Sequence, residues 1–316
     1  MIGQKMNTNL TTQKYKKFII SGNVISALIA VMIIILPGNI LSIPFAFIFY
    51  IIAIKTISSV AANNIILPVL KQNTDPKAFS KILDELKIFT DNATEHIITS
   101  YLSGDYQNVL NICYAKLKDV SQQRYSHIYY TYIARCYFDI GDKVKLKETC
   151  EQFEQMANSA KHGKEIVQKC TAIKFFKLFL EEDYAACKQL YEKIIAQKDF
   201  TNDLLSEVQT KYTYAVACFY TSDFRSATEI FEFIINRTPD LNYAVMSGEY
   251  LDCIKSNIPF TKNPIDIQVT PDFTIPKFTS KRQAIGKILI YTGLFISLVA
   301  VLIFTLTQTN MSFKLF

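Results

Sequence analysis

The sequence of 316 residues lacks the short motifs with which many enzymes hold nucleotides, phosphates or metal ions. Gly-x-Gly-x-x-Gly, the phosphate loop Gly-x-x-x-x-Gly-Lys-Ser/Thr and His-Glu-x-x-His are all missing from it. Histidine is scarce, with only His96, His127 and His162. Folding could still bring one of them into a site, but an isolated histidine is more often packed or exposed. The sequence therefore predicts a protein that is not an enzyme and that carries no cofactor and no metal.

Paired cysteines are also missing, although cysteine itself is not rare. The seven cysteines are an odd number and none is spaced Cys-x-x-Cys, which argues against a disulfide framework and a zinc site. Free thiols suit a reducing cytosol, and we expect these residues to be small members of the core. They are Cys113, Cys136, Cys150, Cys170, Cys187, Cys218 and Cys253.

The middle of the chain lacks an excess of basic residues. Residues 74–258 hold 22 Lys and Arg against 26 Asp and Glu, a net charge of −4, whereas the rest holds 12 against 2, a net charge of +10. A nucleic-acid-binding domain would gather basic residues within its fold. Here the basic residues lie beside apolar runs, where they suit the anionic lipid of an inner membrane leaflet. We expect the lipid bilayer as a partner, and no nucleic acid.

Charge-free stretches long enough to cross a bilayer lie near both ends. Residues 18–36 carry no charge, and a helix of this length, at about 1.5 Å per residue, matches a hydrocarbon core of roughly 30 Å. A Pro-Gly-Asn turn separates them from a second apolar run at 40–60, so residues 18–62 predict a transmembrane hairpin. A cleaved signal peptide is the alternative for the first run, but a second span follows at once where a polar mature region would begin. A third span is predicted at 285–307.

The basic flanks of these runs predict their orientation, because cytoplasmic flanks carry an excess of Lys and Arg. We expect the N-terminus (1–17) and the central region to be cytoplasmic and the tail (308–316) external, in an integral protein of a bacterial plasma membrane. The basic residues that precede the first and third spans are Lys5, Lys14, Lys16, Lys17, Lys277, Lys281 and Arg282.

Small residues recur at four-residue spacing within the spans, a pattern that allows helices to approach closely. This predicts packing of the spans with one another or into an oligomer. The residues are Gly22, Ser26 and Ala30 in the first span, and Gly293 and Ser297 in the third.

An acidic turn recurs along the central region. Gly104-Asp105-Tyr106 has counterparts around Asp142, Asp183 and Asp223, at intervals of 37, 41 and 40 residues. An apolar, aromatic-rich run of helical period lies before and after each aspartate. Intervals of this size indicate a repeat architecture.

In the fourth copy the chain resembles the tetratricopeptide (TPR) repeat family, whose helical hairpins join small and aromatic residues at fixed positions. The second copy departs from the family pattern at Lys143 and Leu146, and the intervals exceed the family's usual length of about 34 residues. The resemblance implies an all-α solenoid of about four hairpins plus capping helices over residues 75–256, and a protein-binding function. It rests on Tyr214, Ala215, Cys218, Phe224, Ala227, Phe231 and Pro239.

Superposed on that family, the first helix of each repeat would present groove-lining residues. They form an aromatic set with one positive charge, which suits an amphipathic helix or an extended apolar peptide. It lacks the Lys and Asn of repeats that grip a terminal carboxylate. The alternative is that these rings are buried against neighbouring helices or against the proline-rich segment that follows the repeats. The partner-binding residues expected are Tyr101, Arg135, Phe138, Phe176, Phe179, Tyr212, Phe219 and Tyr220.

Residues 257–284 combine four prolines with interleaved apolar residues. Prolines at short intervals exclude a helix and favour an extended segment. We call it the strap, and our hypothesis is that it lies along the repeats; a flexible tether is the alternative.

Two classes of function fit these features. The first is a membrane-anchored scaffold or adaptor that presents a protein-binding groove at the cytoplasmic face. The second is a structural subunit of a membrane complex for secretion, transport or envelope assembly, in which the spans make the main contacts.

Overall fold

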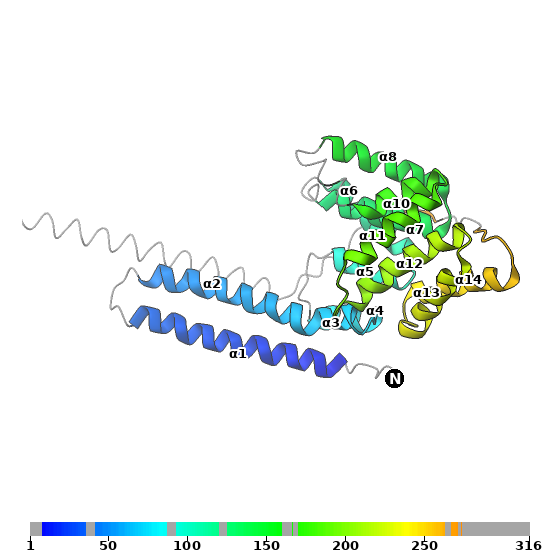
Figure 1. The fold of residues 1–316 in the computed structure, drawn as a ribbon. Helices are drawn as coiled ribbons and strands as arrows, with labels where there is room; N and C mark the ends of the chain where they lie inside the picture. Colours follow the sequence, from blue (N-terminus) through cyan, green and yellow to red (C-terminus); the bar gives the residue numbers. More distant parts are fainter. Residues whose placement is uncertain are drawn as a thin grey trace, which may run out of the picture. The chain divides into compact units, whose positions relative to one another are not determined.

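The computed structural model describes residues 8–35, 42–86, 93–119, 125–159, 166, 170–262, 267–270 and 273. In this part of the chain the regular structure is helical and no strand occurs, so the expected all-α class is confirmed. The chain divides into two compact units (Figure 1). The first holds the described residues up to Pro68 together with 81–86, and the second holds 69–80 and the described residues from 93 onward.

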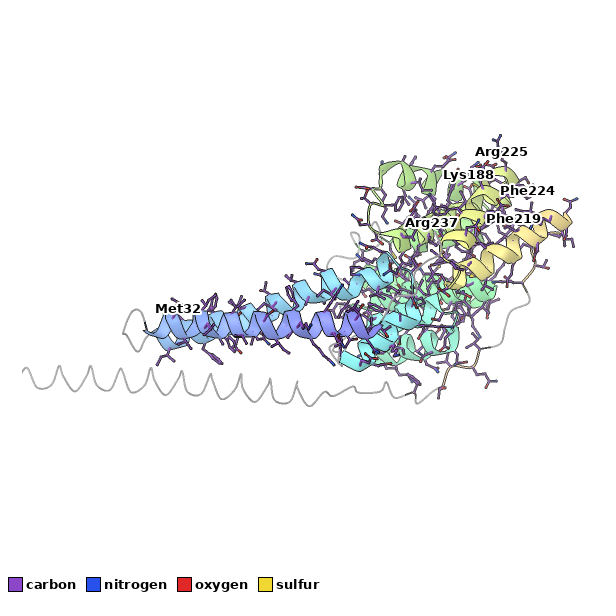
Figure 2. All side chains as sticks on the ribbon, turned by 90° about the horizontal axis from the view of Figure 1, so that it is seen from below. Met32, Lys188, Phe219, Phe224, Arg225 and Arg237 are labelled. Carbon is purple, nitrogen blue, oxygen red and sulfur yellow. The ribbon has the colours of Figure 1, made fainter. Side chains whose placement is uncertain are left out.

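The first unit contains the helices α1 (Thr8–Ile35) and α2 (Ser42–Ala61), which contact each other along their lengths (Figure 1). Both are long and apolar enough to cross a membrane. Their large apolar side chains stand away from the pair, as Met32 does in Figure 2. Ile20, Leu28 and Ile48 are each more than half exposed, which suits a surface that faces lipid. The predicted third span, with Gly293 and Ser297, lies outside the described residues.

The helices of this unit extend beyond the boundaries expected from the sequence. α1 begins at Thr8, ten residues before the expected start of the span, because nothing between Thr8 and Phe18 breaks a helix. The apolar run therefore predicts which part of the helix is long enough to cross a membrane, but it does not predict where the helix begins. Beyond α2 the chain stays helical through a π-helical turn, η1 (Ala62–Ile66), and α3 (Leu67–Lys71). Pro68 has no N–H to donate, and the wider turn before it relieves the clash that its ring would cause.

At Gly22, α1 lies close against α2. A Cβ built on it would lie 2.8 Å from Ile57 Cγ2, so no larger residue fits without movement of α2. Ser26, one turn later, is buried and donates its hydroxyl to the Gly22 carbonyl at 2.9 Å. Ala30 follows on the same face and is half-buried. In the described chain, the small residues of the first span therefore face α2.

The second unit is a series of helices in which, from α5 onward, each described helix contacts the next. The last helix, α14, also returns to contact α5 and α12. Five of the seven cysteines are buried in this unit, as expected for small core residues. The helices are α4 (Pro76–Leu86, shared between the units), α5 (Ala93–Leu102), α6 (Tyr106–Lys118), α7 (Ser126–Ile140), α8 (Lys143–Ser159), α10 (Thr171–Leu180), α11 (Tyr184–Gln197), α12 (Leu204–Tyr220), α13 (Phe224–Arg237) and α14 (Asn242–Ser256).

Four turns between these helices have the same geometry. In each, an aspartate caps the next helix by accepting a hydrogen bond from the backbone N–H three residues on, at 2.9 to 3.2 Å. The aspartate N–H in turn bonds a carbonyl five residues back, which closes the preceding helix. The residue before each aspartate has a left-handed conformation. The four pairs are Gly104-Asp105, Gly141-Asp142, Glu182-Asp183 and Ser222-Asp223.

Candidate functional site

The polar centre of the second unit is a buried carboxylate in the last turn of α7. Asp139 is only 3% exposed. The hydroxyl of Tyr101, at the end of α5, donates to its Oδ2 at 2.7 Å, and that of Tyr106, at the start of α6, lies 3.4 Å from the same atom. The two tyrosines flank one turn, so the first helical hairpin presents both phenols to α7.

Burial raises the pKa of Asp139 to about 6, although the Tyr101 hydrogen bond and the charges of Lys262 and Arg135 favour its ionised form. Asp139 is therefore mostly ionised at neutral pH and takes up a proton in mild acid. Arg135 lies one turn earlier on α7. Its guanidinium carbon is 5.9 Å from the Tyr101 ring centroid and 5.6 Å from that of Tyr132, within the range of cation–π attraction.

The start of α14 completes this polar network. Asn242 donates its amide to the Tyr106 hydroxyl at 2.6 Å, and the Tyr243 hydroxyl lies 3.5 Å from that of Tyr101. Gly104 permits this contact, because its φ is +78° and a Cβ there would lie 2.8 Å from Asn242 Oδ1. The first recurring turn thus supports the last helix of the unit.

The chain after α14 passes back over that helix in extended form. Phe260 stacks on Tyr250 of α14, with ring centroids 3.9 Å apart and planes 14° from parallel. Tyr250 also stacks on Phe231 of α13, at 5.1 Å and 8°. The result is a stack of three rings from three segments, and Phe260 is its outermost member.

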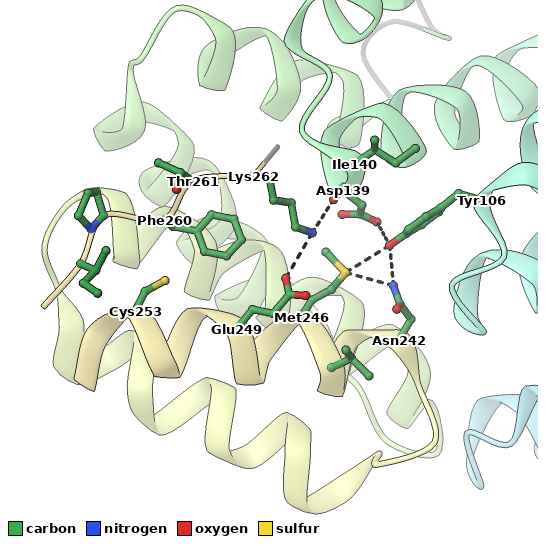
Figure 3. A pocket seen from close by; sticks show the side chains of 13 residues that line it. Tyr106, Asp139, Ile140, Asn242, Met246, Glu249, Cys253, Phe260, Thr261 and Lys262 are labelled. Atoms are coloured by element: carbon green, nitrogen blue, oxygen red, sulfur yellow. Dashed lines mark hydrogen bonds and ion pairs between the residues drawn. The ribbon is translucent and has the colours of Figure 1, made fainter. Parts of the chain in front are cut away.

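Lys262 fastens the same segment at a second point (Figure 3). Its Nζ donates to the backbone carbonyl of Asp139 at 2.5 Å and lies 3.5 Å from the carboxylate of Glu249. A cation at the C-terminal end of α7 also complements the helix dipole. Gly141 leaves room for the lysine, because a Cβ there would lie 2.7 Å from Lys262 Cβ.

Further along the strap, two side chains of α6 bind its backbone. Gln107 donates its amide to the carbonyl of Gln268 at 2.6 Å, and the N–H of Thr270 donates to Asn111 Oδ1 at 2.9 Å. These contacts do not depend on the side chains of the strap. In the described residues, the strap therefore lies against the helices, as the sequence-based hypothesis proposed.

Two cavities adjoin the segment 260–262. The larger has a volume of about 470 Å³ and lies between α14 and the polar network, where it is lined by Tyr106, Asp139, Asn242, Met246, Glu249 and Lys262, among others (Figure 3). The smaller, of about 270 Å³, is lined by one ring from each of α7, α10 and α12, namely Phe138, Phe179 and Tyr220. Phe260, Thr261 and Lys262 line both cavities. The segment thus borders spaces that it does not fill.

The structure brings many of the predicted groove residues together but leaves little of their surface free. The Phe138 ring lies 5.0 Å from that of Phe176 and 4.9 Å from that of Phe179, which is 5.0 Å from that of Tyr220. On the other side, α14 covers Tyr101, Tyr212 and Phe219 through its own tyrosines. The buried members are Tyr101, Phe176, Phe179, Tyr212 and Phe219, whereas Arg135, Phe138 and Tyr220 are half-buried. For the buried members, the alternative of packing against neighbouring helices describes the structure.

Sequence reasoning missed the residues that make this site polar. Asp139 could have been singled out, because it is a lone acid between Phe138 and Ile140 in an apolar run. Glu249 and Lys262 carry no such signal. Glu249 lines the same cavity as Asp139 because α14 packs back on the earlier helices, and Lys262 reaches Asp139 through the chain after α14. Among the described residues, no group of three or more His, Cys, Asp or Glu side chains could hold a metal ion.

No protein-family model, no curated protein and no solved structure matches this chain.

Proposed function

We propose that the chain is a membrane-anchored adaptor of the TPR-like class, which holds a helical repeat unit beside the membrane and binds an extended segment of a protein partner. One observation carries the proposal. Residues 258–262 of the chain itself lie in extended form over α14 and the C-terminal end of α7. Phe260 stacks on Tyr250, and Lys262 is held by the Glu249 carboxylate and the Asp139 carbonyl. A surface that holds such a segment from its own chain has the chemistry to hold one from another protein.

The membrane anchor is the second part of the proposal. Two apolar helices of sufficient length support it, and the Lys residues before the first span favour a cytoplasmic N-terminus and a cytoplasmic repeat unit. The third span and an external tail are part of the same proposal and rest on the sequence pattern alone.

A structural subunit of a membrane complex is the second candidate, and Asn23 favours it. Its Oδ1 is buried and has no hydrogen-bond partner among the described residues. An amide without a partner inside a bilayer is unfavourable, and a helix from another subunit could supply the missing donor.

Photo-crosslinking in the native cell separates the two candidates. A photoreactive amino acid replaces Val245, which lines the larger cavity and is 61% exposed, or Met32, which is 55% exposed on α1. Arg225, on the outer surface of α13 (Figure 2), serves as the control position. Adducts with a specific protein from position 245, and none from 225, support the adaptor. Adducts from position 32 alone would contradict the adaptor and support the structural subunit of a membrane complex.

A further inference from the structure

The extended segment after α14 has the properties of a bound ligand. It has no regular secondary structure and is attached mainly through two side chains, Phe260 and Lys262. Between α14 and Phe260, the residues Ile258 and Pro259 are exposed. We infer that residues 258–262 are a built-in occupant of the surface formed by Tyr250 and Glu249 of α14 and by the C-terminal end of α7, which we call the inner site. The site would then accept, from a partner protein, an extended segment that carries an aromatic residue followed two positions later by lysine or arginine. This inference rests on the proposed function and names the partner's chemistry.

The aromatic position is specified by stacked rings. Phe260 lies on Tyr250 and is 6.3 Å from the Phe219 ring. Because it also borders both cavities, the site has room for a ring larger than phenyl. A flat ring gains most from such a surface, since stacked aromatic pairs contribute beyond their buried area.

The basic position is specified by two acceptors and one further negative charge. Lys262 Nζ lies at the carbonyl end of α7 and beside Glu249, and its charge also acts on the carboxylate of Asp139. An acidic side chain there would face two carboxylates and the negative end of a helix dipole. The site therefore discriminates against Asp and Glu at this position.

The attachment is weak enough for exchange. Glu249 is 47% exposed at its side chain, so solvent screens its ion pair with Lys262 and the pair contributes little to holding the segment. Phe260 is half-buried, and its ring leaves the outer end of the stack without opening the helices. A partner segment with the same two side chains can therefore compete with residues 258–262 for the same surface.

A peptide binding experiment tests this inference. The probe is the hexapeptide Asn-Ile-Pro-Phe-Thr-Lys, acetylated, amidated and carrying 4-fluorophenylalanine, titrated by fluorine NMR against the full-length protein in lipid nanodiscs. We expect F260A/K262A to bind the probe about tenfold more tightly than the wild type, because the tethered segment competes at a millimolar effective concentration. Equal affinity for both proteins, or binding to neither, would overturn the inference.

Charge reversal provides the control. A probe with Glu in place of Lys should bind F260A/K262A at least about tenfold more weakly, and should regain affinity for F260A/K262A/E249K. If F260A/K262A does not unfold cooperatively, K262A alone takes its place, and a smaller gain of the same sign is expected. The proposed function has its own readout. Adducts at position 245 without probe binding refute only the inference, whereas the absence of adducts refutes the adaptor.

Discussion

The ring of Phe260 lies 3.9 Å from the ring of Tyr250, and Lys262, two residues later, lies over Gly141. These two contacts join the segment 258–262 to two helices, the first to α14 and the second to the end of α7. The first depends on stacking and the second on charge and on the absence of a side chain. Each can therefore be tested separately.

Phe260→Ala should lower the free energy of unfolding of the second unit by about 1–2 kcal/mol, because the stack loses its outer ring and part of its buried apolar area. Thermal unfolding of the full-length protein, followed by circular dichroism, measures the change. Ile258→Ala is the matched control. It removes a side chain that is 57% exposed and should change stability by less than about 0.5 kcal/mol. Equal effects of the two substitutions would contradict the stacked arrangement.

Gly141→Ala and Gly248→Ala should have opposite effects. Gly141 has a φ of +87° and an added Cβ would meet Lys262 Cβ at 2.7 Å, so the alanine is strained and displaces the segment. We expect a loss of about 1–3 kcal/mol. Gly248 lies inside α14 with no atom within 4 Å of an added Cβ, and alanine there should stabilise the helix by about 0.5–1 kcal/mol. The same unfolding measurement checks both. A stabilising Gly141→Ala would show that neither the backbone conformation nor the contact with Lys262 is as described.

Much of the second unit follows from local patterns in the sequence. The intervals between Asp105, Asp142, Asp183 and Asp223 predict four turns, and each aspartate caps a helix. Local rules suffice here because a cap and a left-handed residue are set by neighbours within five positions. Phe138, Phe176 and Phe179, which the sequence predicts as lining residues of a groove, pack on one another because α7 and α10 are in contact.

The polar site could not be predicted in the same way. Tyr106 meets Asn242 and Asp139 meets Lys262 across more than a hundred residues. These contacts depend on the angles between the many helices that lie between the two residues in the chain. The sequence contains no local pattern that reports such angles. For this reason, the sequence places these aromatic residues on the helices but does not predict which of them α14 covers.

Asp139→Asn should change the pH dependence of stability. Because the pKa of Asp139 is raised by burial from 3.8 to about 6, the folded protein holds the proton more tightly than the unfolded chain. Its contribution to stability is therefore largest below about pH 4 and is lost as the pH rises through about 6, by about 3 kcal/mol in all at 1.36 kcal/mol per pKa unit. An asparagine side chain does not ionise, so the variant does not lose stability in this way, and its amide oxygen can still accept the hydrogen bond from the Tyr101 hydroxyl. Thermal unfolding at pH 5 and pH 7.5 should show that the stability of D139N rises relative to that of the wild type at the higher pH.

Parallel pH profiles of the two proteins would mean that Asp139 is not buried as an ionisable group. The carboxyl of Glu95, whose pKa burial raises to about 7, leaves a residual slope of the same sign.

Gly22→Leu should separate α1 from α2. A Cβ at this position already lies 2.8 Å from Ile57 Cγ2, and Ile57 is branched at Cβ and cannot rotate freely within a helix. The two helices must then move apart at an overpacking cost of about 1–3 kcal/mol. Cysteines at Ser26 and Ala53, one turn from the contact on each antiparallel helix, report the distance through oxidative crosslinking detected by mass spectrometry. We expect slower crosslinking in G22L than in the parent cysteine pair.

Val24→Leu is the control. It enlarges a side chain that is 54% exposed on α1, so it should leave the crosslinking rate unchanged. If both substitutions slow the reaction equally, the small residues of the first span do not set the distance between the helices. If only G22L does, the small residue at position 22 sets the distance between α1 and α2.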